Sequence, residues 1–523
     1  MQNLTRRNFV MRVGQAGGIG AAYLAMQGLG LQPAMANEPA SVVGLKPTAG
    51  KGTKVVVLGA GMAGLAAAYE LKKGGYDVTL LEARDRPTGR AWTIRSGDKV
   101  DLVDDEEQGG SQVCSWEKGH YLNPGPARIP SHHQTILGYI KELGVDIEVE
   151  VNASRSAYMY NKDANGGKPM LMRAAINDTR GYVSELLAKA VSKGALDQEM
   201  TGIDKEKMVS FLRQYGDLSP DLFYKGSTRS GYKDYPGAAD EVGVAHDPLT
   251  LKALLDQDMW GNVLSEEGIT QQATMFQPVG GIDMTGRAIA KALGPTVKLM
   301  SEVTQLRKVG NGVKVVYKER KTGKEHEVLA DYCVSTIALH LLSKIPNDLS
   351  KDIQDGIAQV TGGGEGMKIG YESVRFWETD FQLYGGLSFS KSPRATLWTP
   401  SGGYHTKKGI TVFYGGLELA KMSRVDQNEN ARKAWDGAFP GYGKLLEKPI
   451  GVQWSKVPYN LGAGSHFSDA TQWLYARLNQ NDGPIYFAAD YLSHVSGWQE
   501  GAIRSGHHAV KQINERVQAT KPA

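Results

Sequence analysis

The sequence predicts an α/β fold built on a parallel sheet that carries a dinucleotide site. A continuous apolar run at 55–58 leads into a glycine-rich turn, and strong helix formers and a second apolar run at 77–81 follow. A further apolar run at 484–489 precedes a C-terminal helical stretch. Runs of this length are typical of strands buried on both faces of a parallel sheet. With 523 residues, the chain is long enough for two or three intermixed domains.

Composition and charge narrow the function classes. Hydrophobic residues make up 41% and charged residues 22% of the chain, as in an ordinary soluble globular protein. The net charge is +4, and without the first 36 residues 57 Lys and Arg stand against 56 Asp and Glu. A nearly neutral chain argues against nucleic acid as a partner. Cys114 and Cys333 form no zinc or C-x-x-C spacing, which leaves free thiols or a single disulfide open.

Residues 1–36 are expected to be an export signal. Arg6 and Arg7 precede a weakly apolar, Gly/Ala-rich stretch, and Ala34-Met35-Ala36 forms a small-x-small cleavage pattern. This arrangement resembles a twin-arginine signal, so a periplasmic or secreted protein is expected. Its interrupted apolar run favours no stable membrane span. Residues 37–51 are expected to be a loose linker.

The glycines after the first strand predict the dinucleotide site in detail. Gly59 permits the tight turn, Gly61 lets the backbone approach a pyrophosphate, and Gly64 lets helix and strand pack closely. The helix that begins there offers unpaired N–H groups to the phosphates. Glu82 ends the second strand, where a carboxylate accepts hydrogen bonds from the ribose hydroxyls and repels a 2′-phosphate. The segment therefore predicts a Rossmann-type site for NAD or FAD rather than NADP.

The residues after Glu82 favour FAD. Gly89-Arg90 resembles the arginine-glycine segment of the flavin amine oxidase superfamily, in which the arginine contacts the flavin pyrophosphate. Thr88 replaces the first of the two glycines usual there. Val303 lies in a segment similar to the one whose valine backbone holds the adenine in that superfamily.

The C-terminal segment resembles the closing motif of the same superfamily. Asp490 ends the last apolar run, at the place of an acid, usually Glu, that contacts the ribityl chain. Gly497-Trp498 leads into the final helix, whose N-terminus, with Ala502, faces the flavin ring in the family. Because neither cysteine lies near this motif, the FAD is expected to be non-covalent.

The resemblance implies a glutathione-reductase-like FAD domain, a mixed-sheet substrate domain and a helical insert. The implied FAD-binding segments are 52–110, 276–345 and 460–523, the substrate-binding segments are 111–150 and 346–459, and the insert is 151–275. The implied cofactor-binding residues are Gly59, Gly61, Met62, Ala63, Gly64, Glu82, Ala83, Arg84, Gly89, Arg90, Gly125, Pro126, Ala127, Arg128, Val303, Asp490, Gly497, Trp498 and Ala502.

Two cationic residues are expected to act in catalysis. Arg128 projects from a Pro- and Gly-rich loop at 119–130 that resembles the loop of bacterial FAD-dependent L-amino acid oxidases in which an arginine clamps the substrate carboxylate. A planar guanidinium suits that role because it binds a carboxylate through two charge-assisted hydrogen bonds. Lys368 matches the family lysine that holds a water beside flavin N5, where its charge would also stabilise the superoxide formed from O2.

Two tryptophans complete the expected substrate site. Gly497 and Trp498 resemble the family's wall over the substrate amine. Trp398 stands where relatives place a tyrosine that completes carboxylate binding, and its indole N–H is the expected substitute. No metal site is expected, since the paired histidines at 132–133 and 507–508 lack a carboxylate at metal spacing and are expected on the surface or in helices.

The resemblance implies oxidative deamination of L-amino acids, with hydride transfer from Cα to flavin N5. The products would be a 2-oxo acid, ammonia and hydrogen peroxide, with a homodimer left open. Three alternatives remain at this point: an amino-acid 2-monooxygenase that forms an amide, a primary amine or polyamine oxidase, and a redox-silent flavoprotein.

Overall fold

The computed structural model describes residues 43–104, 110–364 and 366–520. A five-stranded parallel sheet forms the centre of its first part. Its strand order is β14-β2-β1-β18-β24, and every neighbouring pair is parallel. The strands are β1 (Lys54–Leu58), β2 (Asp77–Leu81), β14 (Val297–Lys298), β18 (Tyr332–Ser335) and β24 (Ile485–Phe487). Their carboxyl ends therefore meet along one edge, although they come from three distant parts of the chain.

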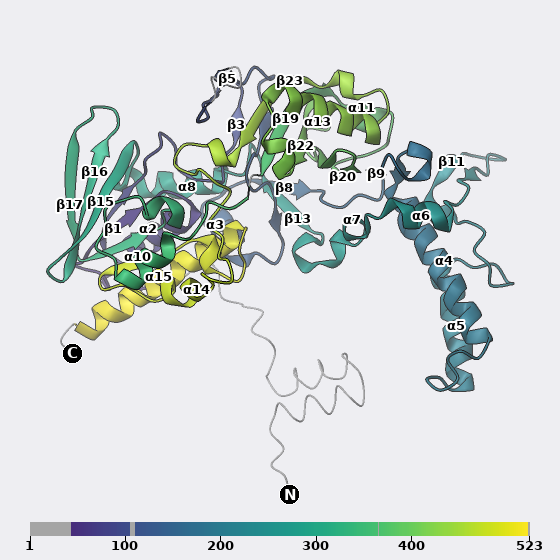
Figure 1. The fold of residues 1–523 in the computed structure, drawn as a ribbon, viewed down its shortest axis with the longest axis horizontal. Coiled ribbons are helices and arrows are strands. Elements are labelled where there is room, and N and C mark those ends of the chain that lie inside the picture. The colour runs from purple at the N-terminus through teal and green to yellow at the C-terminus, as the bar shows by residue number, and fades with distance from the viewer. Residues whose placement is uncertain (1–42, 105–109, 365, 521–523) are drawn as a thin grey trace, which may run out of the picture.

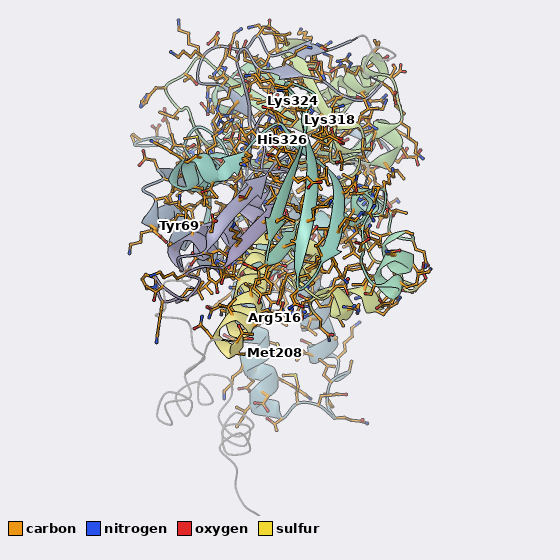
Figure 2. All side chains as sticks on the ribbon, turned by 90° about the vertical axis from the view of Figure 1, so that its left-hand side faces the viewer. Tyr69, Met208, Lys318, Lys324, His326 and Arg516 are labelled. Carbon is orange, nitrogen blue, oxygen red and sulfur yellow. The ribbon has the colours of Figure 1, made fainter. Side chains whose placement is uncertain are left out.

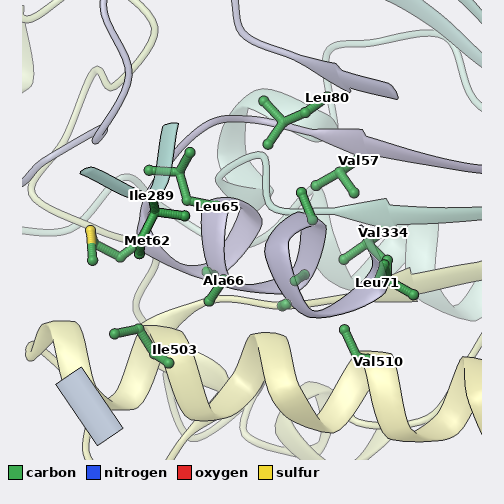
Figure 3. Close-up of a cluster of buried hydrophobic side chains, with 14 of the residues drawn as sticks. Val57, Met62, Leu65, Ala66, Leu71, Leu80, Ile289, Val334, Ile503 and Val510 are labelled. Carbon is green, nitrogen blue, oxygen red and sulfur yellow. The ribbon is translucent and has the colours of Figure 1, made fainter. Parts of the chain in front are cut away.

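Two helices cover one face of this sheet. α2 (Met62–Lys73) follows β1 directly, and α15 (Gln499–Thr520) packs against it from the far end of the chain. Their apolar side chains form one buried cluster with those of α8 (Met284–Leu293) and α3 (Gln134–Glu142). Figure 3 shows Ile503 and Val510 of α15 facing Ala66 and Leu71 of α2. The approach is so close that a Cβ on Gly506 would lie 2.5 Å from the carbonyl oxygen of Ala63.

A three-stranded antiparallel sheet packs on the other face. It contains β15 (Ser301–Val309), β16 (Gly312–Glu319) and β17 (Glu325–Ala330), and its apolar side chains join those of β1 and β24 in a second cluster. Figure 2 looks onto this sheet, with Lys318 and His326 labelled on β16 and β17. α10 (Lys351–Ile357) and α14 (Trp473–Leu478) complete this layer.

A seven-stranded mixed sheet forms the second part of the molecule, as the sequence predicts. Its order is β10-β9-β20-β21-β22-β19-β23, with β20 and β9 parallel and the other pairs antiparallel. Helix α13 (Arg424–Ala438) covers one face through a cluster rich in aromatic residues. The strands are β9 (Tyr158–Tyr160), β10 (Met170–Leu171), β19 (Met367–Val374), β20 (Gly386–Lys391), β21 (Arg394–Thr399), β22 (Lys408–Gly415) and β23 (Glu447–Gln453).

A smaller sheet joins the predicted substrate loop to this region. β13 (Met275–Pro278) pairs with both β7 (Ile129–Pro130) and β8 (Ile147–Glu150), so residues expected in different domains share one sheet. The remaining short elements are β3 (Ile94–Arg95), β4 (Lys99–Val100), β5 (Gln112–Val113), β6 (Tyr121–Leu122), α9 (Leu339–Leu342), α11 (Phe376–Thr379) and α12 (Leu417–Ala420).

The insert expected at 151–275 is α-helical only from Met172 onward. Its first part forms β9 and β10, which add to the mixed sheet, because the alternating Tyr158–Tyr160 segment pairs with β20. The helical part extends away from both large sheets (Figure 1). It contains α4 (Met172–Ser192), α5 (Gly202–Gly216), the hairpin of β11 (Tyr232–Asp234) and β12 (Val244–Ala245), α6 (Leu251–Gln257) and α7 (Trp260–Val263).

The expected loose linker is packed where the structure describes it. Val43 and Leu45 contact the α2 cluster, and the Gly50 N–H donates to the Gly74 carbonyl at 2.8 Å. The expectation is therefore wrong for residues 43–51, because Val43 and Leu45 find apolar partners on the folded domain. The expected leader, 1–36, lies outside the described residues. In the part of the chain that is described, no helix combines the length and apolarity needed to cross a bilayer.

Gly64 is expected to be essential for stability, while Gly61 is not. A Cβ on Gly64 would lie 2.0 Å from the Gly59 carbonyl oxygen, whereas one on Gly61 would meet nothing within 4 Å. Gly64→Ala should therefore lower the free energy of unfolding by about 1–3 kcal/mol through overpacking. Gly61→Ala, the matched control, should leave it nearly unchanged. Denaturant unfolding measures both, and equal losses would contradict the packing argument.

Candidate active site

One cavity of about 1070 Å³ spans the carboxyl edge of the parallel sheet and the nearest strands of the mixed sheet. The predicted dinucleotide residues line one end, and Arg128, Lys368 and Trp398 line the other. Two residues predicted to bind the cofactor lie outside its lining: Gly64, which packs against Gly59, and Ala127, which faces a neighbouring cavity. The other predicted site residues all line the large cavity.

The dinucleotide end is shaped by backbone and by one fixed carboxylate. Gly59 has a φ of 99°, which favours glycine, and Gly61 precedes the first turn of α2 beside open space. The Glu82 carboxylate accepts hydrogen bonds from the N–H groups of Ala60 at 2.8 Å and Arg84 at 2.9 Å. These two bonds hold it against the wall and leave lone pairs free, as recognition of a ribose requires.

Arg90 and Asp490 pair with each other across the cavity wall. Predicted as separate cofactor contacts, they form an ion pair, and Arg90 also donates to the Ala463 carbonyl at 2.7 Å. Asp490 in turn accepts from the Gly497 N–H at 3.1 Å. The pair joins the segment after β2 to the segment after β24, so the two predicted motifs build one wall. Sequence spacing could not show this, because the two residues lie 400 positions apart.

Arg128 is a half-buried cation that lies between two aromatic rings. Its guanidinium carbon lies 4.9 Å from the ring centre of Trp398 and 5.8 Å from that of Trp498. One nitrogen donates to Gln271 Oε1 at 2.8 Å, while the buried Nε has no partner. Burial lowers the pKa of Arg128, although Glu150 opposes the shift. Within the described chain, no carboxylate lies close enough to Arg128 for an ion pair.

Lys368 lies at the start of β19 and is only 7% exposed. Its Nζ donates to the carbonyls of Gly125 at 2.6 Å and Asn123 at 3.2 Å. Burial, reinforced by the charge of Arg128, lowers the pKa of Lys368 to about 7, and Glu150 opposes the shift. The lysine therefore ties the loop that carries Arg128 to the mixed sheet.

The expected role of the Trp398 indole N–H is wrong. That group donates to Glu150 Oε1 at 2.8 Å, so it is not free for a substrate carboxylate. Trp398 instead turns its ring face toward Arg128. The indole N–H turns away because the buried Glu150 carboxylate offers it an acceptor at the end of β8.

Several side chains at or near the site belong to no recognisable sequence motif. His133 packs its ring 5.0 Å from that of Trp498, edge to face, and is 3% exposed. His507 is also buried and shares a hydrogen bond of 2.7 Å with Tyr139. The histidines were expected on the surface or in helices; His507 does lie in helix α15, whereas His133 lies buried just before α3, against the Trp498 ring. Gln271 and Glu150 likewise follow no motif.

The two thiols, and the group of metal-type ligands found among the described residues, do not line this cavity. Cys114 and Cys333 are free and buried, and neither lines the cavity. Glu117, His120 and Glu372 come together elsewhere. There the Glu372 carboxylate already accepts from the Glu117 N–H at 2.7 Å and from Lys448 at 2.5 Å. This carboxylate is thus compensated by protein donors.

The cavity and the fold define an oxidoreductase of the flavin type, and sequence comparison agrees. Residues 62–514 match the family of flavin-containing amine oxidoreductases, and the chain belongs to that family. A flavin cofactor is therefore implied, and the glycine turn, the open space at Gly61 and the fixed Glu82 carboxylate fit its nucleotide part.

Known relatives and structures share most of the chain. An L-amino-acid oxidase of Demansia vestigiata is 24% identical over 507 residues, which cover 91% of this chain and 89% of that protein. A cyclohexylamine oxidase from Brevibacterium oxydans IH-35A superimposes with a TM-score of 0.59 at 17% identity, over 89% of this chain and 99% of that one. A putrescine oxidase bound to putrescine gives 0.58 at 18% identity, over 88% and 98%. The predicted fold class is confirmed.

Proposed function

We propose that this protein is an FAD-dependent L-amino acid oxidase. One L-amino acid, one O2 and one water give a 2-oxo acid, ammonia and hydrogen peroxide. The observation that carries the proposal is Arg128, which lies half-buried in the cavity with a buried, unpartnered Nε and only a neutral hydrogen-bond partner. A buried charge without a counter-ion is costly, and a substrate carboxylate would compensate it.

FAD is the proposed form of the flavin, bound without a covalent link. The Gly59–Gly64 turn and the N-terminus of α2 would hold the pyrophosphate, and Glu82 the ribose. Support for non-covalent binding comes from the cavity lining, which includes neither Cys114 nor Cys333.

The chain itself would mainly bind and orient the substrate. Arg128 would hold the carboxylate between the Trp398 and Trp498 rings, which exclude water from that end of the cavity. When bound, the flavin accepts the hydride that leaves Cα. Lys368 would keep a positive charge or a bound water near the reacting atoms, and it fixes the loop that presents Arg128. Positioning of this kind supplies most of the catalysis expected without a general base.

The main alternative is an amine oxidase that needs no carboxylate. The solved neighbours named putrescine oxidase and cyclohexylamine oxidase favour it. The burial of Arg128 argues against it, because an amine lacks the negative charge that would compensate the guanidinium. An amino-acid 2-monooxygenase would use the same residues, and product analysis separates the two: a 2-oxo acid from the oxidase, an amide from the monooxygenase.

Replacement of Arg128 tests the carboxylate site. Arg128→Ala should weaken binding of L-amino acids by two to three orders of magnitude or more, which corresponds to roughly 3–5 kcal/mol for a buried charge partner. Arg128→Lys should recover part of the loss, since it restores charge without the planar fork. Anaerobic reduction of the flavin, followed against substrate concentration, gives the dissociation constants.

The matched control is Arg394→Ala, an exposed arginine at the start of the strand that carries Trp398. It should bind amino acids as the wild type does. An unchanged dissociation constant in Arg128→Ala would contradict the proposed role.

The pKa of Lys368, lowered to about 7 by burial, predicts a pH-dependent reaction with O2. Below pH 7 the lysine is charged and stabilises a developing superoxide, and above pH 7 it is neutral. Reoxidation of the reduced flavin should therefore slow by about ten- to a hundredfold as pH rises through 7. Lys368→Met should reoxidise slowly at every pH, and its reoxidation should be slowed more than its reduction by saturating amino acid, which also depends on the loop that Lys368 holds. The same pH dependence in both proteins would rule out the lysine as its source.

We also propose export through the twin-arginine route, on the strength of Arg6, Arg7 and the small-residue motif at 34–36. Replacement of Arg6 and Arg7 by lysine should leave the precursor in the cytoplasm, as judged by fractionation and its unprocessed mass. Unchanged export of that variant would contradict the route.

A further inference from the structure

A second, smaller cavity of about 210 Å³ adjoins the active-site cavity. Its lining includes exposed residues, among them Lys118 and Gly403, together with half-buried Trp398 and buried Lys368 and Glu150. Lys368 and Trp398 line both cavities. They therefore lie between the proposed substrate site and a second pocket whose lining includes exposed residues.

Glu150 forms the floor of this second cavity. It is the last residue of β8, opposite Met275 of β13, and is 4% exposed. Its Oε1 accepts the Trp398 indole N–H at 2.8 Å, whereas its buried Oε2 has no partner. The function proposed above assigns no role to the Glu150 carboxylate.

The charges around Glu150 come from several elements. Arg128 and Lys368 both stabilise its anion, while burial opposes them and raises the pKa of Glu150 to about 6. Other titratable groups that line the same cavity are Lys118, His120, Tyr121, Glu148 and Arg375. Among these, Tyr121 and Glu150 also interact electrostatically.

We propose that Glu150 is a positioning residue for Arg128. It acts in two ways: it orients the Trp398 ring against the guanidinium, and its negative charge offsets the positive charge of Arg128. The proposal rests on the proposed function, because it assumes that Arg128 receives a carboxylate. By accepting the indole N–H, Glu150 keeps the Trp398 ring face toward the guanidinium. Its negative charge also offsets two like charges, Arg128 and Lys368, that would otherwise repel each other in one buried site. The second cavity lets it exchange protons with solvent.

Two substitutions at this position should have opposite effects on carboxylate binding. Glu150→Gln keeps an acceptor for the indole N–H but removes the charge. The site becomes more positive, and 3-phenylpropanoate, a carboxylate without an amino group, should bind about five- to tenfold more tightly at pH 8. Glu150→Leu removes acceptor and charge together, so Trp398 loses its orientation and the same ligand should bind at least about tenfold more weakly. Perturbation of the flavin spectrum in the holoenzyme reports binding.

The pH profile separates this role from a purely structural one. In the wild type, the dissociation constant of 3-phenylpropanoate should fall as pH falls through about 6, because Glu150 takes up a proton and no longer offsets Arg128. Protonation of Lys368 near pH 7 acts in the same direction, so the profile has two steps. Glu150→Gln should show one step in place of two, and that step should lie below 7, because the charge of Glu150 no longer raises the pKa of Lys368.

Trp398→Phe supplies a further control that keeps an aromatic ring under Arg128. Glu150 then loses the donor that stabilises its anion, so the step near pH 6 should move to higher pH. If Glu150→Leu fails to fold, as judged by circular dichroism, Glu150→Gln and Trp398→Phe still decide the question.

Two failures are distinguishable. If the wild type binds no carboxylate and no amino acid reduces its flavin, the proposed function itself is wrong. If the wild type binds 3-phenylpropanoate and Glu150→Gln shows the wild-type affinity and the wild-type pH profile, the positioning role of Glu150 is wrong and the proposed function stands.

Discussion

The partial burial of the Arg128 guanidinium without an ion pair is the constraint on which the active end of the cavity depends. A buried charge is tolerated only where other groups compensate it. Here two aromatic faces, the Gln271 amide and the distant charge of Glu150 do so in part. The unpartnered Nε leaves that compensation incomplete. On this account the site favours a ligand with a negative charge, whatever the side chain of that ligand is.

Contacts between the N-terminal and C-terminal segments of the fold keep Arg128 in place. The near contact of α2 and α15 at Gly506 brings the last helix beside the first glycine turn, and the Arg90–Asp490 pair joins the same two regions at the cavity. The Glu500 carboxylate, near the start of α15, accepts hydrogen bonds from the Thr135 and Ile136 N–H groups at 3.2 and 3.0 Å. The helix after the Arg128 loop is thereby attached to the C-terminal segment that carries Trp498.

The sequence predicts the arrangement of site residues that lie close together in the chain. The glycine turn and Glu82 lie within one βαβ unit, so spacing alone predicts their arrangement, and Arg128 belongs to one rigid loop. The sequence does not predict contacts that join distant strands. Nothing in the segment that ends at Glu150 marks it as buried, and the direction of the Trp398 indole depends on that acid. The strands β9 and β10 were missed for the same reason, since only their pairing with β20 makes them part of the sheet.

The most direct test of the account is anaerobic bleaching of the flavin absorbance by matched substrates. Each L-amino acid of a panel is compared with its D-isomer and with the amine that its decarboxylation would give. The account predicts bleaching by L-amino acids and little or none by the amines, because only the former carry the carboxylate that Arg128 requires. Bleaching by the amines, with none by the L-amino acids, would contradict it.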